Sequence, residues 1–246
     1  MIRLFLAVDG GREMGRGVRA HDSSPSWWDV CRVSEDGAAA RLVQRVLERG
    51  GTTAADFEVC VEKFPRIHQS AEEAELSATE TFRRGYRGKL AATWALAKTM
   101  KCGGVVVLVD TDRSEPRTRW GELNRCREEA VVAGESLARR TAIGEATRCF
   151  EAWILGTAES IHLALGGPPC AAPSAAEQES DPKSLVEQWL GLDGRQRSSV
   201  AHMYAEVCGR ASISQLLTRC SMSFKPFADE VIGRLGPMFG VVGPTT

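Results

Sequence analysis

The chain has 246 residues, of which 43% are hydrophobic, and this is enough apolar surface for a folded unit with a substantial core. Its 31 Lys and Arg residues balance 32 Asp and Glu residues, so no net positive charge attracts nucleic acid, and any contact with a polyanion must come from a local patch. No apolar run reaches the length of about 18 residues that a membrane span needs, so we expect a cytoplasmic protein that contacts no membrane.

Strand and helix patterns alternate along the first 165 residues. The pattern begins with a strand at 2–8 and a strand at 27–33, which runs through the acidic turn SEDG into an amphipathic helix at 38–51. The later patterns are a strand at 56–64, a helix at 88–104, a strand at 105–109, a helix at 119–140 and a strand followed by a helix at 141–166. This order favours an α/β fold with a largely parallel sheet, helices on both faces and a site at the carboxyl ends of the strands.

The remaining residues have a different character. Residues 166–181 are rich in Pro, Ala and Ser, which predicts an exposed loop or linker, and short helical patterns follow it. We therefore expect an α/β domain at 1–165, a linker at 166–181 and a C-terminal helical segment at 182–246.

Carboxylates dominate the candidate site, because the eight cysteines contain no C-x-x-C pair and the four histidines lie far apart, which argues against zinc. The apolar run VVVLV ends abruptly in Asp110-Thr111-Asp112. Side chains two apart on a strand point the same way, so Asp110 and Asp112 would repel each other unless a cation, a proton or a basic group lies between them.

A second acidic turn carries Glu35 and Asp36 after the strand at 27–33, and in an alternating fold it falls on the same edge of the sheet as Asp110. Converging carboxylates without imidazole or thiolate partners suit Mg²⁺ or Mn²⁺. Capping of the next helix is the alternative role for such residues. Further acidic candidates are Glu115, Glu145 and Glu151.

Three classes of protein use a D-x-D motif. A haloacid-dehalogenase phosphatase uses the first Asp as nucleophile and the second as general acid, but its motif normally follows the first strand, and no acidic pair is evident downstream here. A nucleotide-sugar glycosyltransferase would use D-x-D for Mn²⁺ and a diphosphate, and nothing else in the sequence indicates a sugar pocket.

The third class accounts for more of the chain. The segments DTDRSE, ATRCFEAWILG, DPKSLVEQWL and CSMSFKPFADEV resemble toprim-fold proteins, in particular the OLD-family and RloB-like proteins of bacterial defence loci, over roughly residues 28 to 232. The resemblance implies a toprim-like, Rossmann-like fold and a nuclease or nuclease subunit that uses Mg²⁺ or Mn²⁺ to cleave DNA or RNA in defence against phage. It also implies a partner ATPase subunit or a homo-oligomer. The alternative is a catalytically silent toprim-like module that binds such a partner.

The resemblance assigns roles to individual residues. Glu35 matches the acidic residue that serves as metal ligand or general base, Asp110 and Asp112 match the metal-binding pair, and Glu151 matches a further acidic residue that is either a ligand or a helix-start carboxylate. Basic residues that would contact phosphate are Arg113, Arg117, Arg119 and Lys183.

A competing match for the first acidic residue lies near the N-terminus, at Asp9 and Glu13 in AVDGGRE. We favour Glu35, because a clear amphipathic helix follows it, whereas Asp9 opens a glycine-rich turn with no helix pattern behind it.

Overall fold

The fold is known from a computed structural model, which describes residues 1–9, 31–33, 37–52, 57–73, 85–111, 118–166, 173–191 and 197–241. Five strands form one sheet in the order β2-β3-β1-β4-β5. They are β1 (Ile2–Val8), β2 (Cys31–Arg32), β3 (Phe57–Lys63), β4 (Gly104–Asp110) and β5 (Thr141–Ala146). β1 pairs in parallel with both β3 and β4, and β4 pairs in parallel with β5. The predicted α/β fold with a largely parallel, Rossmann-like sheet is therefore confirmed.

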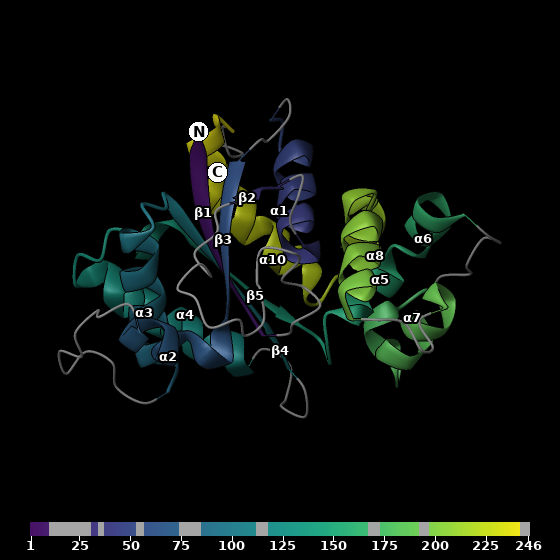
Figure 1. Ribbon diagram of the computed structural model, residues 1–246, viewed down its shortest axis with the longest axis horizontal. Helices are drawn as coiled ribbons and strands as arrows, with labels where there is room; N and C mark the ends of the chain where they lie inside the picture. Colours follow the sequence, from purple (N-terminus) through teal and green to yellow (C-terminus); the bar gives the residue numbers. More distant parts are fainter. Residues whose placement is uncertain are drawn as a thin grey trace.

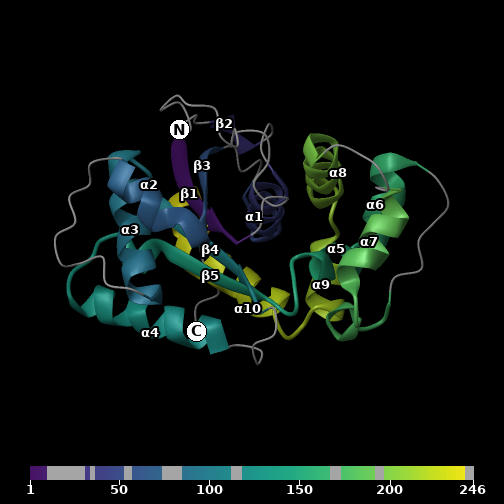
Figure 2. The same ribbon diagram turned by 60° about the horizontal axis from the view of Figure 1, so that its bottom comes forward.

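Helices cover both faces of this sheet, as two views show (Figures 1 and 2). On one side lie α2, α3 and α4, and on the other lie α1 and α10, with the remaining helices packed further out. The helices are α1 (Ala38–Arg49), α2 (Ile67–Glu73), α3 (Tyr86–Thr99), α4 (Thr118–Val132), α5 (Glu151–Gly156), α6 (Ala158–Leu165), α7 (Pro182–Leu190), α8 (Arg197–Gly209), α9 (Ile213–Arg219) and α10 (Phe224–Glu230). Within the described ranges, no helix combines the length and the apolar character that a membrane crossing requires.

The alternation of side chains along β1 feeds two separate cores. Leu4, Leu6 and Val8 are buried in the core shared with α1 and the C-terminal helices, whereas Phe5 and Ala7 are buried in the core shared with α3 and α4. A strand buried on both faces reads as a continuous apolar run, which explains why residues 2–8 and 105–109 predict strands so clearly.

The C-terminal helical segment packs directly on the sheet. Phe227 of α10 is buried, lies against Gly144 of β5, and stacks on the ring of Trp153 with centroids 5.1 Å apart. Phe224 meets the same indole edge to face at 5.1 Å. These contacts make the C-terminal segment one cover of the sheet, continuous with the α/β core.

The predicted linker at 166–181 is anchored in its described part. Residues 167–172 lie outside the described residues, but Glu177 is buried, and its carboxylate accepts hydrogen bonds from the backbone N–H groups of Met222 at 2.9 Å and Ser223 at 2.8 Å. Because a buried carboxylate needs such donors, this part of the segment is held against the residues that precede α10, while Gln178, Ser180 and Asp181 are exposed.

One strand differs from the sequence-based expectation. The strand predicted at 27–33 was expected to run parallel to its neighbours, but within the described residues it comprises only Cys31–Arg32 and pairs antiparallel with β3 at the sheet edge. Its carboxyl end therefore points opposite to those of the other four strands. The premise that both acidic turns follow strands of one direction is wrong for this reason, and the turn with Glu35 and Asp36 itself lies outside the described residues.

Candidate metal site at the carboxyl edge of the sheet

The order of the parallel strands reverses at one position on the carboxyl edge of the sheet. From β1 the chain passes to β3 on one side, and it later reaches β4 on the other side of β1. Ligands of open α/β sheets bind outside the carboxyl ends of the strands where the strand order reverses in this way. Here that position lies between β1 and β4, and the first residue after β1 is Asp9, while the last residue of β4 is Asp110.

Asp9 and Asp110 are linked through the backbone. The backbone N–H of Asp9 donates to the carbonyl of Leu108 at 3.0 Å, and the backbone N–H of Asp110 donates to Oδ2 of Asp9 at 3.3 Å. By alternation, Asp9 continues the row of Phe5 and Ala7, whereas Asp110 continues the row that faces the other core. A cation held by both carboxylates must therefore lie beyond the strand ends. We call Asp9 and Asp110 together the edge site.

A basic side chain already lies at the edge site. Arg119, in the first turn of α4, places its Nη1 atom 3.2 Å from Oδ2 of Asp9 and 2.6 Å from the carbonyl oxygen of Asp110. Both side chains of the ion pair are mostly buried, with 23% of Arg119 and 20% of Asp9 exposed, so solvent screens the attraction only in part. The guanidinium therefore pairs with the Asp9 carboxylate and binds the backbone carbonyl at the end of β4.

The face of the sheet that carries α3 and α4 adds two polar groups. Glu145 of β5 is buried, and its Oε2 accepts the backbone N–H of Trp120 at 3.1 Å, so the first turn of α4 is fixed beside β5. Burial raises the pKa of Tyr86 at the start of α3; the positive charge of Arg119 opposes this rise, and the negative charges of Asp9 and Glu145 add to it. Tyr86 is therefore a protonated hydroxyl within electrostatic reach of the edge site.

The opposite face brings Glu151 and Cys149 to the turn after β5. The Tyr204 hydroxyl of α8 donates to Oε1 of Glu151 at 3.0 Å, and Glu151 is buried. Burial raises the pKa of the Cys149 thiol well above its usual range, and the negative charges of Glu151 and Asp110 raise it further. The thiol is therefore protonated at neutral pH and is not a nucleophile.

The turns after β4 and β5 are tied together by Thr111. Its backbone N–H donates to the carbonyl of Ala146 at 3.0 Å, and its buried hydroxyl accepts the backbone N–H of Arg148 at 2.6 Å. Arg148 has φ of 65°, a conformation that side chains rarely adopt, and its Nη1 donates to the carbonyl of Ser180 at 3.4 Å. This bond connects the carboxyl edge to the start of α7.

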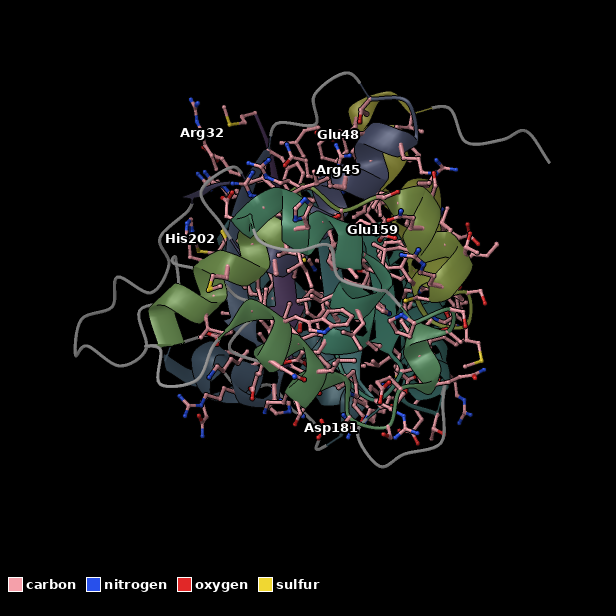
Figure 3. All side chains as sticks on the ribbon, turned by 90° about the vertical axis from the view of Figure 1, so that its right-hand side faces the viewer. Arg32, Arg45, Glu48, Glu159, Asp181 and His202 are labelled. Atoms are coloured by element: carbon pink, nitrogen blue, oxygen red, sulfur yellow. The ribbon has the colours of Figure 1, made fainter. Side chains whose placement is uncertain are left out.

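The structure places only some of the predicted site residues. Asp110 ends β4 as expected, and Glu151 lies at the start of α5 in the neighbouring turn. Lys183 is exposed in the first turn of α7, close to Asp181, whose side chain caps that helix. Figure 3 labels Asp181 at the lower end of the molecule, and the parallel strands run toward this end in Figure 1. The candidates that lie outside the described residues are Glu13, Glu35, Asp36, Asp112, Arg113, Glu115 and Arg117.

The competing acidic match at Asp9 gains support from this geometry. Asp9 follows β1, the strand directly beside β4, whereas β2 lies two strands from β1 and runs the opposite way. The sequence argument gave weight to the helix that follows Glu35, and that helix, α1, is present. Strand direction and neighbourhood, which decide where a turn lies, are not visible in that pattern.

The chemistry of the edge site suits a hard cation. Within the described ranges, no group of three or more His, Cys, Asp or Glu side chains is arranged to hold a metal ion. The oxygens at the edge site are the carboxylates of Asp9 and Asp110 and the carbonyl of Asp110, with a guanidinium among them. Oxygen ligands of this kind, with water completing the coordination, fit Mg²⁺ or Mn²⁺ rather than a softer metal.

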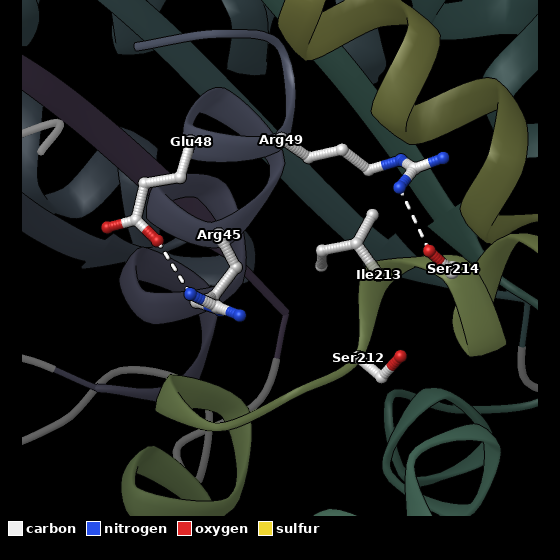
Figure 4. A pocket seen from close by; sticks show the side chains of 6 residues that line it. All are labelled: Arg45, Glu48, Arg49, Ser212, Ile213 and Ser214. Carbon is white, nitrogen blue, oxygen red and sulfur yellow. Dashed lines mark hydrogen bonds and ion pairs between the residues drawn. The ribbon is translucent and has the colours of Figure 1, made fainter. Parts of the chain in front are cut away.

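A shallow pocket of about 420 Å³ lies elsewhere, between α1 and α9 (Figure 4). Its charged side chains are already paired, since Nη1 of Arg45 lies 2.8 Å from Oε2 of Glu48 and Nη1 of Arg49 lies 2.9 Å from Oγ of Ser214. The pocket shares no residue with the edge site, and its side chains offer no acidic group free of a basic partner. We therefore place the candidate site at the carboxyl edge.

Tyr86 and Tyr204 were not predicted from the sequence to lie near this edge, and both belong to helices far away in the chain. Arg119 was predicted as a contact for phosphate, but its pairing with Asp9 joins residues 110 positions apart and was not predicted. The only sequence signal for Tyr86 is its place at the start of a helix. Comparison of the chain with models of protein families, with curated proteins and with solved structures finds no match.

Proposed function

We propose that the protein is a toprim-like nuclease, or the nuclease subunit of a larger assembly, that uses Mg²⁺ or Mn²⁺ to hydrolyse phosphodiesters of DNA or RNA. The observation that supports this most is the position of Asp9 and Asp110 at the ends of neighbouring parallel strands, where the strand order reverses. The D-x-D sequence at Asp110 and the toprim-like segments favour phosphodiester hydrolysis over other reactions at this edge of the sheet.

The residues of the edge site suit this chemistry. Asp9 and Asp110 would hold the ion, and Asp112 belongs to the same motif. A bound divalent ion neutralises the phosphate oxygens, activates water and stabilises the leaving oxygen. The protonated hydroxyl of Tyr86 can donate to a phosphate oxygen, and the guanidinium of Arg119 already lies at the edge site.

The setting of this activity belongs to the same proposal. The resemblance to OLD-family and RloB-like proteins suggests a role in defence against phage in the cytoplasm, with an ATPase subunit or a second copy of the chain as partner. The balanced charge supports a partner that supplies target recognition, because the chain carries no net positive charge. Light scattering on the isolated chain measures its association state.

The test is a cleavage assay with four substrates. Plasmid, single-stranded DNA, RNA and a chromogenic phosphomonoester are incubated with the wild-type protein, with and without Mg²⁺ or Mn²⁺. We expect metal-dependent cleavage of a nucleic acid, which Asp9→Asn and Asp110→Asn abolish. The control is Asp229→Asn, which removes an equally sized charge from an exposed position on α10. Loss of activity in the control as well would mean that the assay reports folding or net charge.

Two other outcomes identify the alternatives. Hydrolysis of the phosphomonoester alone, lost in Asp110→Asn but with Mg²⁺ binding partly retained, would indicate a D-x-D phosphatase with Asp110 as nucleophile. A wild-type protein that binds no divalent ion, cleaves nothing and loses stability on either substitution would be a silent module. The contact between Arg119 and Asp9 favours the silent module, because the guanidinium compensates the negative charge of the Asp9 carboxylate without a metal ion.

A further inference from the structure

The position of Arg119 suggests a role that goes beyond binding phosphate. One nitrogen of its guanidinium, Nη1, contacts two oxygens at once: the carboxylate oxygen of Asp9 at 3.2 Å and the carbonyl oxygen of Asp110 at 2.6 Å. These oxygens come from the ends of two neighbouring strands, and the Asp9 carboxylate is also the group that a divalent ion at the edge site would use. The guanidinium and the ion therefore compete for the Asp9 carboxylate.

The contact is built by the fold. Arg119 lies in the first turn of α4, and this turn is fixed by the hydrogen bond from the Trp120 N–H to the buried Glu145 carboxylate of β5. Asp9 is fixed in turn by its backbone bond to Leu108 and by the N–H of Asp110 on its Oδ2. Both partners are held by backbone atoms, so the pair is preorganised, unlike two long side chains that meet by chance at a surface.

We propose that Arg119 is the resident cation of the edge site: it occupies the oxygens of Asp9 and Asp110 in the metal-free protein and gives them up when a divalent ion binds. The inference rests on the proposed function, since it assigns a regulation to the same site. Arg119 keeps the Asp9 carboxylate paired in the absence of metal. The divalent ion must therefore reach a higher concentration before it binds at the edge site. Once displaced, its positive charge remains beside the position of a phosphate.

A competitor of this kind weakens metal binding by the free energy of the contact that must be broken. The contact combines a partly exposed ion pair with a charge-assisted hydrogen bond, so removing the competitor should tighten metal binding by about threefold to tenfold, which corresponds to about 0.7–1.4 kcal/mol. The same removal should destabilise the metal-free protein, because the Asp9 carboxylate then loses its ion pair with the Arg119 guanidinium. Loss of a competitor strengthens metal binding and lowers the stability of the metal-free protein. Loss of a residue that positions the metal ligands weakens metal binding and lowers stability as well.

The experiment titrates Mn²⁺ into the full chain by isothermal calorimetry and measures thermal unfolding in a chelator. The variants are Arg119→Gln, which removes the charge, and Arg119→Lys, which keeps it. Asp9→Asn serves as the variant that should lose the ion. The matched control is Arg125→Gln, because Arg125 is an exposed arginine of the same helix. It reports the effect of net charge alone.

We expect Arg119→Gln to bind Mn²⁺ about threefold to tenfold more tightly than the wild type while melting at a lower temperature in chelator. Arg119→Lys should bind within about twofold of the wild type, and Arg125→Gln should match the wild type in both measurements. Equal or weaker binding by Arg119→Gln, with Asp9→Asn still losing the ion, overturns this inference and leaves the proposed function standing. Absence of Mn²⁺ binding in every variant overturns both.

Discussion

The hydroxyl of Tyr204 donates a hydrogen bond of 3.0 Å to Oε1 of Glu151 and so joins helix α8 of the C-terminal segment to the first residue of α5. Both side chains are buried. Glu151 also interacts with the thiol of Cys149, which lies within electrostatic reach of Asp110. The C-terminal segment is thereby connected to the carboxyl edge of the sheet through one buried polar contact.

Substitution of Tyr204 by Phe removes the hydroxyl while keeping the ring. A buried carboxylate that loses a donor costs about 1–3 kcal/mol, so we expect the free energy of unfolding to fall by that amount. Urea denaturation followed by circular dichroism measures it. Glu151→Gln replaces the charge-assisted hydrogen bond from Tyr204 by a weaker neutral one, so part of the interaction is already lost, and combining it with Tyr204→Phe should cost less than the sum of the single effects. Additive costs would contradict a direct contact.

A methyl group on Gly144 tests how closely α10 packs on β5. A Cβ at this position would lie 2.5 Å from Cδ2 of Phe227 and 2.9 Å from Cδ1 of Leu108, so Gly144→Ala should destabilise the fold by about 1–3 kcal/mol. Gly121→Ala in α4 is the control, since a Cβ there meets no atom within 4 Å and gains about 0.5–1 kcal/mol of helix propensity. If both variants have the same stability, α10 is not seated on the sheet as described.

A buried ion pair fastens α4 to α10 across the edge strand. Arg127 is 1% exposed, forms a two-nitrogen contact with the Glu230 carboxylate and donates to the carbonyl of Thr141 at 2.9 Å. We expect Glu230→Gln to cost about 3 kcal/mol, at the lower end for removing one partner of a buried pair, because Glu128 also lies beside the guanidinium.

The measurement is the midpoint of guanidinium or urea unfolding, interpreted with an unchanged slope. Asp229→Asn on the same helix is the control, since Asp229 is 63% exposed and its ion pair with Lys225 should contribute less than about 1 kcal/mol. A loss no greater than that of the control would show that Arg127 is solvated rather than buried.

The ion pair between Glu159 and Arg219 predicts a pH dependence of stability. Arg219 donates two hydrogen bonds of 2.7 Å to the Glu159 carboxylate, and these bonds lower the pKa of Glu159. A carboxyl whose folded pKa is depressed contributes stability that is fully present above its ordinary value of 4.5 and is lost as the pH falls through the lower, folded value.

We therefore expect Glu159→Gln to be less stable than the wild type at pH 7 and nearly as stable as the wild type in strongly acidic solution. Because 43% of the Glu159 side chain is exposed, solvent screening limits the difference at pH 7 to less than about 1 kcal/mol. Urea midpoints of both proteins between pH 7 and pH 3 give the comparison. Glu159 belongs to α6 and is labelled in Figure 3. A difference that grows with acidity has the wrong sign for this pair.

Most of the fold follows from local sequence patterns. Residues 105–109 and 141–146 are buried on both faces of a sheet, so their apolar character is visible without knowing their neighbours, and α1 and α3 have helical periodicity ending in glycine or near it. The direction of β2 could not be predicted, because a strand of two residues at a sheet edge has the same period whether it pairs parallel or antiparallel.

The candidate site divides in the same way. Asp110 was predicted because the end of a buried strand at a carboxylate is a local feature. The contacts of Asp9 with Arg119 and of Glu151 with Tyr204 join residues 110 and 53 positions apart, and only tertiary packing brings them together. Preference for Glu35 over Asp9 followed the presence of a helix behind it, although strand order, which is non-local, decides which turn lies beside Asp110.

The most direct test of the account is the location of Mn²⁺ in a crystal of the protein soaked with that ion, determined from its anomalous scattering. The account predicts one peak beyond the ends of β1 and β4, within coordination distance of carboxylate oxygens of Asp9 and Asp110, with the Arg119 guanidinium moved away from Oδ2 of Asp9. An empty edge site at millimolar Mn²⁺, with Arg119 still bound to Asp9, would contradict it.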